Sequence, residues 1–439
     1  MANVVKFEEI HSNVGGIDIG SESIFVSIDG EKVVSFKTFT ADYHSCCKYL
    51  QENDIESVAM EATGVYWMSL YSMLEDYGIK VCLVHPREVQ QVKGRKTDVK
   101  DSQWIQRLYG AGLLRESIVA PGKQKELRIF VRERLDLIEM GSTYINKMQK
   151  CLELMNLKLH NVISQINGAS GLRIIKAILQ GERDTEELLG LCDERIDASK
   201  HEDIKKSLEG NYRAEYLLLL KENLRLWEEH QASVKTIEHA IGRLLEELNQ
   251  GNKDIRVTSK SKPTRHHQPD IKGLHKTMVQ IYGGVNLTSI LGINDCTMLR
   301  LLAEVGNDMS RFPTKKHFVS WLGLSPSNKQ SGKMKKRVKS PTNNAGLIFR
   351  LSAQSLMSSK NSAIGIFIRR LNGKKGPQVA IKAGARKIAE AFYNALTRGI
   401  DYVEQGIQKY MEQIRINEIR LINKLANKHM IILNYPETT

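Results

Sequence analysis

Four carboxylates in the N-terminal part of the chain are spaced so that they can act together on a cation. Asp18 lies in GGIDIG between two isoleucines, and Glu61 follows the apolar run Ser57–Met60. Asp98 and Asp101 lie in KTDVKDSQW, three residues apart and therefore on one face of a helix. Carboxylates beside buried strands are costly unless they are paired, hydrogen-bonded or bound to a cation. Taken singly, each carboxylate is explained by a strand end or a helix cap, so a shared site requires that the four lie close together in the fold.

The chemistry that suits such a cluster is metal-assisted phosphodiester cleavage. Three or four converging carboxylates match Mg²⁺, which prefers oxygen ligands in an octahedron. Two such ions, about 4 Å apart, activate the attacking oxygen and stabilise the leaving oxygen. We therefore expect Asp18, Glu61, Asp98 and Asp101 to form a shared catalytic Mg²⁺ site, with Mn²⁺ as an alternative ion.

A second chemically active segment, WLGLSPSNKQSGKMKKRVKSPTNNAGLIFRLSA, spans residues 321–353. Ser331 precedes Gly332, which lets a phosphate approach the backbone. A serine hydroxyl is a weak nucleophile unless it is activated, and neighbouring cations would stabilise an attacked phosphate. By chemistry alone, Ser325, Ser327 and Ser340 are equally plausible nucleophiles. The segment could equally be a phosphate-binding loop without a catalytic role. The expected nucleic-acid contacts are Lys333, Lys335, Lys336, Arg337, Lys339 and Arg350.

The elements that position the acids follow from the hydropathy pattern. Residues 14–110 predict an α/β domain in the order three strands, helix, strand, helix, strand and helix, in which Val14–Ile19 and Ser23–Ile28 form a hairpin. Acids from the first strand, the fourth strand and a late helix would then converge. This order resembles the ribonuclease-H-like fold of Holliday-junction resolvases.

The C-terminal two thirds of the chain predict helices. Glu126–Leu159 and Glu202–Leu248 carry apolar residues at helical spacing, which indicates a long helical hairpin or coiled coil that serves as an arm or a dimer seam. Residues 287–306 predict helix, glycine turn and helix, which is either a phosphate-binding hairpin or an ordinary packed pair.

The positive charge is concentrated in one stretch. The 439-residue chain has a net charge of +14, yet Met309–Ala389 contains 18 lysines and arginines and no acidic residue, so the remainder has a net charge of −4. This distribution predicts a polyanionic partner, most simply nucleic acid, bound around Ser331 with strong salt dependence.

Other protein classes are excluded by composition. We expect no membrane span, because no apolar run reaches about 18 residues, and no secretory signal. The six cysteines are sparse and lack C-x-x-C spacing, which favours a reduced intracellular protein without a zinc site.

Five motifs in this order are similar to those of the IS-one-ten family of insertion-sequence transposases, most closely its IS-eleven-eleven branch: GIDIG, MEATGVYW, GRKTDVKDSQW, SWLGLSPSNKQSG and KAGARKIAEAFYNAL. The resemblance covers about residues 14–400. It implies a resolvase-like domain with the acidic DEDD set, a coiled-coil arm and a mainly helical domain with a nucleophilic serine. Asp18, Glu61, Asp98 and Asp101 match the acids, and Ser331 matches the serine of the Ser-Gly motif.

The resemblance also implies an activity and its partners. Family members are RNA-guided DNA recombinases, in which an element-encoded non-coding guide RNA (bridge RNA) pairs with target and donor DNA. They act as dimers of dimers, join the acids of one subunit to the serine of another, and form a covalent phosphoserine–DNA intermediate. The implied location is the bacterial cytoplasm, at the nucleoid.

The expected organisation has five parts. The bounds are 1–120 for the resolvase-like catalytic domain, 121–252 for the helical coiled-coil region, 253–272 for a basic linker, 273–400 for the serine transposase domain and 401–439 for a helical tail.

Two other functions compete with this interpretation. A metal-dependent Holliday-junction resolvase or nuclease would use only the acids and would not need Ser331. A non-catalytic RNA- or DNA-binding protein would carry a degenerate acidic set, which the presence of all four acids and the serine disfavours.

Overall fold

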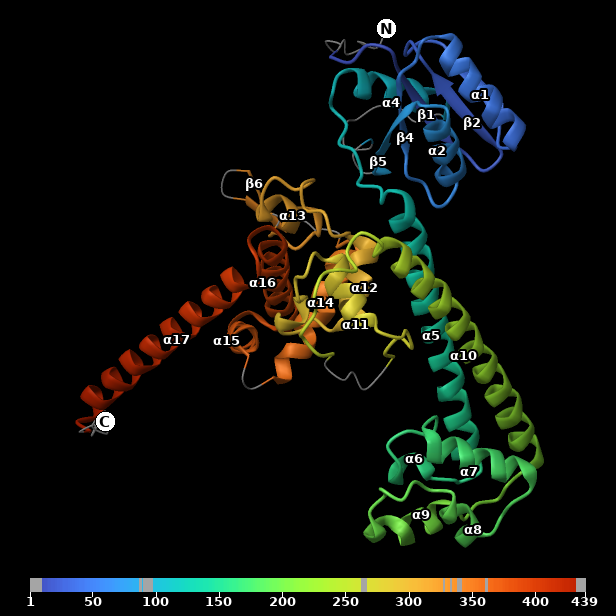
Figure 1. Cartoon of the computed structure of the whole chain (residues 1–439), viewed down its shortest axis with the longest axis vertical. Coiled ribbons are helices and arrows are strands. Elements are labelled where there is room, and N and C mark those ends of the chain that lie inside the picture. Colours follow the sequence, from blue (N-terminus) through green and yellow to red (C-terminus); the bar gives the residue numbers. More distant parts are fainter. Residues whose placement is uncertain are drawn as a thin grey trace. The chain divides into compact units, whose positions relative to one another are not determined.

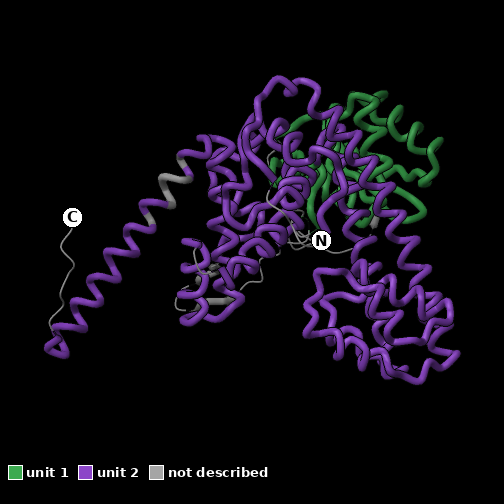
Figure 2. Tube along the Cα trace, turned by 60° about the horizontal axis from the view of Figure 1, so that its bottom comes forward, with its two compact units in different colours: residues 1–119 green, residues 120–439 purple. Residues whose placement is uncertain are grey.

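The computed structural model describes residues 10–86, 89, 98–261, 267–326, 328–331, 334–337, 342–359 and 362–431. The chain forms two compact units, Met1–Val119 and Ala120–Thr439 (Figure 2).

The first unit is built on a five-stranded mixed sheet in the order β3-β2-β1-β4-β5 (Figure 1). Strands β1, β2 and β3 pair antiparallel and include the expected hairpin of β1 with β2. Strand β1 pairs in parallel with β4, and β4 pairs in parallel with β5. The strands are β1 Val14–Ile19, β2 Ser23–Ser27, β3 Val34–Lys37, β4 Ser57–Glu61 and β5 Lys80–Val84. The predicted α/β class and the order of strands and helices are confirmed, apart from the segment after Pro86, most of which lies outside the described residues.

The two faces of this sheet are covered by different helices because successive side chains of a strand point to opposite faces. Ile17 and Met60 face α1 (Thr40–Glu52) and α2 (Trp67–Asp76), and all contribute to one large core. Ala59 belongs to a second, smaller core with Ile105 of α4, which spans Asp98–Gly110. Helix α4 therefore covers the sheet face that contains Ala59 and every second residue from it along β4.

Helix α4 crosses β1 at very short range, and Gly16 makes this possible. A Cβ at Gly16 would lie 2.3 Å from the Ser102 carbonyl oxygen and 2.3 Å from the Gln106 amide nitrogen. Further along, the Gln106 side chain donates to the Val14 carbonyl (3.4 Å), and the Ile10 amide donates to the Gly110 carbonyl (2.8 Å). Helix α4 therefore runs antiparallel to β1, and its first turn lies toward the carboxyl end of β1.

The second unit starts with two long antiparallel helices, α5 (Gly122–Leu154) and α10 (Ala214–Leu248). Lys123 near the start of α5 pairs with Glu247 near the end of α10, and the buried pair Arg134–Glu238 (2.7 Å) lies between α5 and α10 further along. The far ends are joined by short helices, which share an apolar core with the ends of α5 and α10. These are α6 Leu159–Val162, α7 Ala169–Gln180, α8 Thr185–Gly190 and α9 His201–Ser207.

Both long helices are shorter than the periodicity predicts. Helix α5 ends at Leu154 rather than Leu159, and Asn156 adopts a left-handed conformation (φ 58°). Residues 202–248 are not one helix, because the chain turns between α9 and α10 at Gly210, where a Cβ would lie 2.4 Å from the Met155 carbonyl oxygen. The apolar spacing continues through this turn, so periodicity alone could not locate it.

The remainder of the second unit is mainly helical and packs around Phe318, Phe349 and Phe392, which are fully buried. Its elements are α11 Leu274–Ile281, α12 Asp295–Glu304, α13 Lys315–Trp321, β6 Asn328–Ser331, β7 Met334–Arg337, α14 Asn344–Ser355, α15 Ala363–Lys375, α16 Pro377–Arg398 and α17 Ile400–His429. In the described part of the chain, no helix is long and apolar enough to cross a membrane.

The expected helix, glycine turn and helix over residues 287–306 is only half present. The first part is a single 3-10 turn, Leu287–Ser289, and Gly292 (φ 90°) then leads into α12. The Asn286 side chain caps this turn by accepting from the Thr288 amide (3.1 Å). The prediction of a helix before Gly292 is therefore wrong.

Replacing Gly16 with alanine should destabilise the first unit by about 3 kcal/mol, because the new methyl group overlaps the α4 backbone, which cannot move without disturbing the sheet. Urea unfolding and hydrogen exchange of the β1 and α4 amides measure the effect. The control is Gly190→Ala at an open helix end, where no atom lies within 4 Å of the new Cβ. Equal stability of the two variants would contradict the close crossing.

Candidate functional site

Asp18 and Glu61 lie on neighbouring strands at the same end of the sheet. In the parallel pairing of β1 with β4, Ile17 is level with Met60, and Asp18 and Glu61 are the next residues along each strand. Asp18 is two residues from Gly16, and Glu61 is two residues from Ala59, so both belong to the face that α4 covers. Both side chains are half-buried.

Asp101 comes to this end of the sheet on α4. It directly precedes Ser102, whose carbonyl lies over Gly16, and the antiparallel crossing directs the first turn of α4 toward the carboxyl end of β1. The Asp101 side chain is half-buried. Asp98 is the first residue of α4, and its side chain lies outside the described part of the chain.

The acids match Mg²⁺ in donor type and in sharing one end of one sheet face. Among the described residues, however, no group of three His, Cys, Asp or Glu side chains is placed to hold a metal ion. One Glu61 oxygen accepts a hydrogen bond from the Thr63 hydroxyl (3.2 Å). The backbone thus gathers the predicted residues, while a complete ligand set would need Asp98 and a closer approach of the side chains.

Ser331 is the last residue of β6, at the tip of a two-stranded hairpin between α13 and α14. It pairs with Met334 of β7, so the connection consists of residues 332 and 333. Lys335, Lys336 and Arg337 form most of β7, and only their backbone is described. Lys333, Lys339, Ser327 and Ser340 lie outside the described residues.

Arg350 of α14 and Lys382 of α16 are both half-buried, on helices that pack against each other. Burial lowers the pKa of Lys382, and the positive charge of Arg350 lowers it further. Two neighbouring cations in an acid-free stretch favour an anion between or near them. Sequence reasoning selects Arg350 but not Lys382, whose only signal is its place in that stretch.

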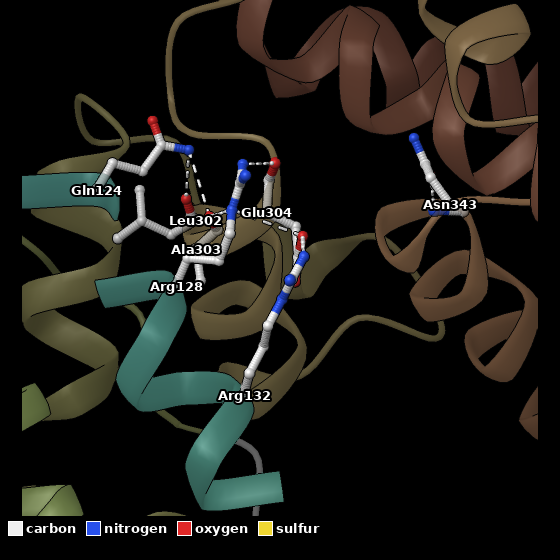
Figure 3. A network of polar contacts seen from close by, with 8 residues as sticks. Gln124, Arg128, Arg132, Leu302, Ala303, Glu304 and Asn343 are labelled. Atoms are coloured by element: carbon white, nitrogen blue, oxygen red, sulfur yellow. Dashed lines mark hydrogen bonds and ion pairs between the residues drawn. The ribbon is translucent and has the colours of Figure 1, made fainter. Parts of the chain in front are cut away.

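A polar network fastens the long helix α5 to the end of α12 (Figure 3). Gln124 donates to the Leu302 carbonyl (3.2 Å), and Arg128 donates to the Glu304 carbonyl (2.9 Å). Arg132 binds the Glu304 carboxylate through two hydrogen bonds of 2.8 and 2.9 Å. The guanidinium of Arg128 therefore satisfies helix-end carbonyls at the negative end of the α12 dipole.

The start of α14 is fixed separately. The Asn343 side chain accepts from the Gly346 amide (2.8 Å) and donates to the Trp321 carbonyl (3.0 Å). It thereby connects the first turn of α14 to the end of α13, which are the two helices that flank the Ser331 hairpin.

A hydroxyl, an imidazole and a carboxylate form a chain that sequence reasoning does not reveal. The Ser259 hydroxyl lies 2.9 Å from His275 Nε2, and His275 Nδ1 lies 2.6 Å from the buried Asp295 carboxylate. This is the order of groups in a hydrolase triad. Ser261 bonds the other Asp295 oxygen, so two hydroxyls of one extended segment are held by α11 and α12. We interpret these hydrogen bonds as contacts that hold residues 251–261 against α11 and α12. No local sequence motif indicates them.

Two family models match the chain. The IS110 DEDD transposase model covers residues 15–157, which contain all four predicted acids. The model described as transposase IS116/IS110/IS902 family covers residues 285–357, which contain Ser331 and Arg350. The α/β unit and the helical unit thus each carry part of a transposase, an enzyme that acts on DNA. The chain belongs to the IS110 family, which confirms the resemblance seen in the sequence. No curated protein matches the chain.

Replacing His275 with alanine should lower the free energy of unfolding by about 3 kcal/mol, because the buried Asp295 carboxylate loses its main partner. Urea unfolding measures this change. Thr258→Ala, at an exposed position of the same segment, is the control and should shift stability by less than about 0.5 kcal/mol. A small effect of the His275 variant would mean that the contact with Asp295 contributes little.

Proposed function

We propose that this transposase is an RNA-guided DNA recombinase that cleaves and rejoins DNA strands with an acidic metal site and a serine nucleophile. The observation that carries the proposal is the placement of Asp18, Glu61 and Asp101 at one end of one sheet face, in a chain whose second family match contains Ser331. The two chemistries reside in different compact units.

In the proposed acidic site, Asp18, Glu61, Asp98 and Asp101 would hold Mg²⁺, with Mn²⁺ as the alternative. When bound, the ion would supply Lewis-acid stabilisation of charge on the scissile phosphate. The protein contributes the fixed strand ends and the α4 crossing, and the Thr63 hydroxyl orients one Glu61 oxygen.

In the proposed covalent step, Ser331 Oγ loses its proton and attacks the phosphorus atom. A bond from Oγ to phosphorus forms, the bond from phosphorus to the 3′ oxygen breaks, and a free 3′-hydroxyl is released. The 3′-hydroxyl of the exchanged strand then attacks the phosphoserine and releases the serine. Because each step exchanges one phosphoester for another, no ATP is required.

The finer fold assignments belong to the same proposal. We assign the first unit to the ribonuclease-H-like, resolvase-like class, which the order of its mixed sheet and the position of α4 support. The antiparallel helices α5 and α10 would serve as the coiled-coil arm, supported by their pairing along most of their length.

The proposed partners are target DNA, donor DNA and an element-encoded guide RNA. The acid-free stretch of 18 cations supports a nucleic-acid partner, and the positive charge that Arg350 exerts on Lys382 supports phosphate binding there. The guide RNA, a dimer of dimers with composite active sites, and a location at the bacterial nucleoid rest on family membership. Sequencing the RNA that co-purifies with the chain tests the guide.

The second candidate is a metal-dependent Holliday-junction resolvase or nuclease. It is favoured by the fact that the acids lie in one compact unit that needs no serine for hydrolysis. The two functions differ in their dependence on Ser331.

Ser331→Ala should abolish covalent protein–DNA adducts on denaturing gels, because the phosphoserine bond cannot form. Ser325→Ala is the matched control in the same segment and should retain them. Asp18→Asn should also lose adducts while its circular dichroism is unchanged. Adducts that persist in Ser331→Ala would refute the serine assignment, and metal-dependent cleavage that persists without adducts would favour the nuclease.

Replacing Lys335, Lys336 and Arg337 together with alanine should reduce the slope of log K against log salt by about 2 to 3, because each lost phosphate contact removes about 0.9 from it. Fluorescence anisotropy with duplex DNA measures the slope. The control replaces Lys200, Lys205 and Lys206, which lie outside the acid-free stretch. Equal slopes for the two variants would place the DNA contacts elsewhere.

A further inference from the structure

The loop after Glu61 exposes apolar side chains beside the acidic site. It connects β4 to α2 and belongs to the MEATGVYW motif, of which the proposed mechanism uses only Glu61 and Thr63. The exposed fraction is 68% for Val65 and 49% for Tyr66 in the loop, and 37% for Met68 in the first turn of α2. Exposed apolar side chains that form a contiguous patch are typical of binding sites.

This loop is held in place by its own contacts. The Ala62 amide donates to the Val84 carbonyl (2.9 Å), and the Trp67 indole N–H donates to the Gly64 carbonyl (3.2 Å). The Trp67 ring in turn packs edge-on against Tyr71, which belongs to the core of the first unit. Val65 and Tyr66 are therefore presented to solvent by an anchored backbone.

The Tyr66 ring lies against Gly64. A Cβ at Gly64, which has φ 54°, would lie 3.7 Å from both Cδ2 and Cε2 of Tyr66. The edge of the ring that carries these two atoms thus lies near Gly64, while about half of the residue remains exposed. A half-exposed aromatic ring is suited to stacking, because every base offers a flat face that can pack on it.

The loop is also tied directly to the carboxylate. The Thr63 amide donates to the Glu61 carbonyl (2.9 Å), and the Thr63 hydroxyl donates to the Glu61 side chain (3.2 Å). Val65 and Tyr66 follow within five residues of Glu61. A strand whose phosphate is held at Glu61 through a bound cation would therefore place a neighbouring base near the apolar loop.

We propose that Val65 and Tyr66 form a nucleobase-binding site, in which an unpaired base next to the scissile phosphate stacks on the Tyr66 ring. This inference rests on the proposed function, because that function brings a DNA strand to Glu61. A base is the fitting occupant because an apolar, aromatic surface adjoins carboxylates that would bind a phosphate through a metal ion, and bases follow phosphates along a nucleic-acid strand. The base must be unpaired, because a paired base is already stacked within its helix.

The test measures binding of a four-way DNA junction with 2-aminopurine at the branch, in Ca²⁺, by the full-length chain carrying Ser331→Ala. Tyr66→Ala should weaken binding about tenfold and abolish the quenching of 2-aminopurine that stacking produces. Tyr66→Phe should retain both, since it keeps the ring. Phe39→Ala is the control, because Phe39 is 66% exposed in the same unit.

An abasic nucleotide in place of 2-aminopurine separates stacking from other causes. Tyr66→Ala should then weaken binding by less than about twofold, since no base remains to stack. An equal loss with the abasic junction, equal loss in Tyr66→Phe, or unchanged quenching in Tyr66→Ala would overturn the proposal. A change in oligomeric mass caused by Tyr66→Ala would overturn it in favour of a contact between copies.

The readouts keep this proposal distinct from the proposed function. Binding and quenching are measured without cleavage, so the nucleobase site can fail while Ser331 adducts still form in the unmodified chain. Conversely, quenching that depends on Tyr66, together with a complete absence of Ser331 adducts, would retain the nucleobase site and reject the serine mechanism.

Discussion

The close crossing of α4 over β1 is the constraint on which the candidate active site depends. With no side chain at Gly16, the α4 backbone approaches the strand so closely that its direction and register are fixed by hard contacts. Asp101 is carried by that helix and Asp18 by that strand. The carboxylates are therefore positioned by a backbone contact two residues away from Asp18, which holds them at one end of the sheet against their mutual repulsion.

The chain separates two electrostatic tasks. The first unit places half-buried acids at a sheet end, where their like charges repel one another. The second unit contains the whole acid-free stretch, where burial and the positive charge of Arg350 lower the pKa of Lys382. Because the acids and the acid-free stretch lie in different units, the acids do not form ion pairs with those cations inside one unit.

The sequence predicted the features that depend on local pattern. Alternation located β1 and β4, and therefore Asp18 and Glu61, because a strand in a buried sheet must repeat every two residues. The turn at Gly210 was missed because apolar spacing continues through it, and the Ser259–His275–Asp295 chain was missed because its members come from distant segments. The proposed role of Ser331 as nucleophile came from family motifs, since several serines in that segment are chemically equivalent.

The far end of the α5–α10 pair has a consequence for how such a chain can evolve. The chain leaves α5 at Met155 and returns beside it, where the Asn211 amide donates to the Met155 carbonyl (3.0 Å). The short helices between these two residues share one apolar core with Met148 and Leu152 of α5 and with Leu220 and Leu224 of α10. A change in the length of this segment is therefore tolerated best at its exposed turns, away from the side chains that pack against the two long helices.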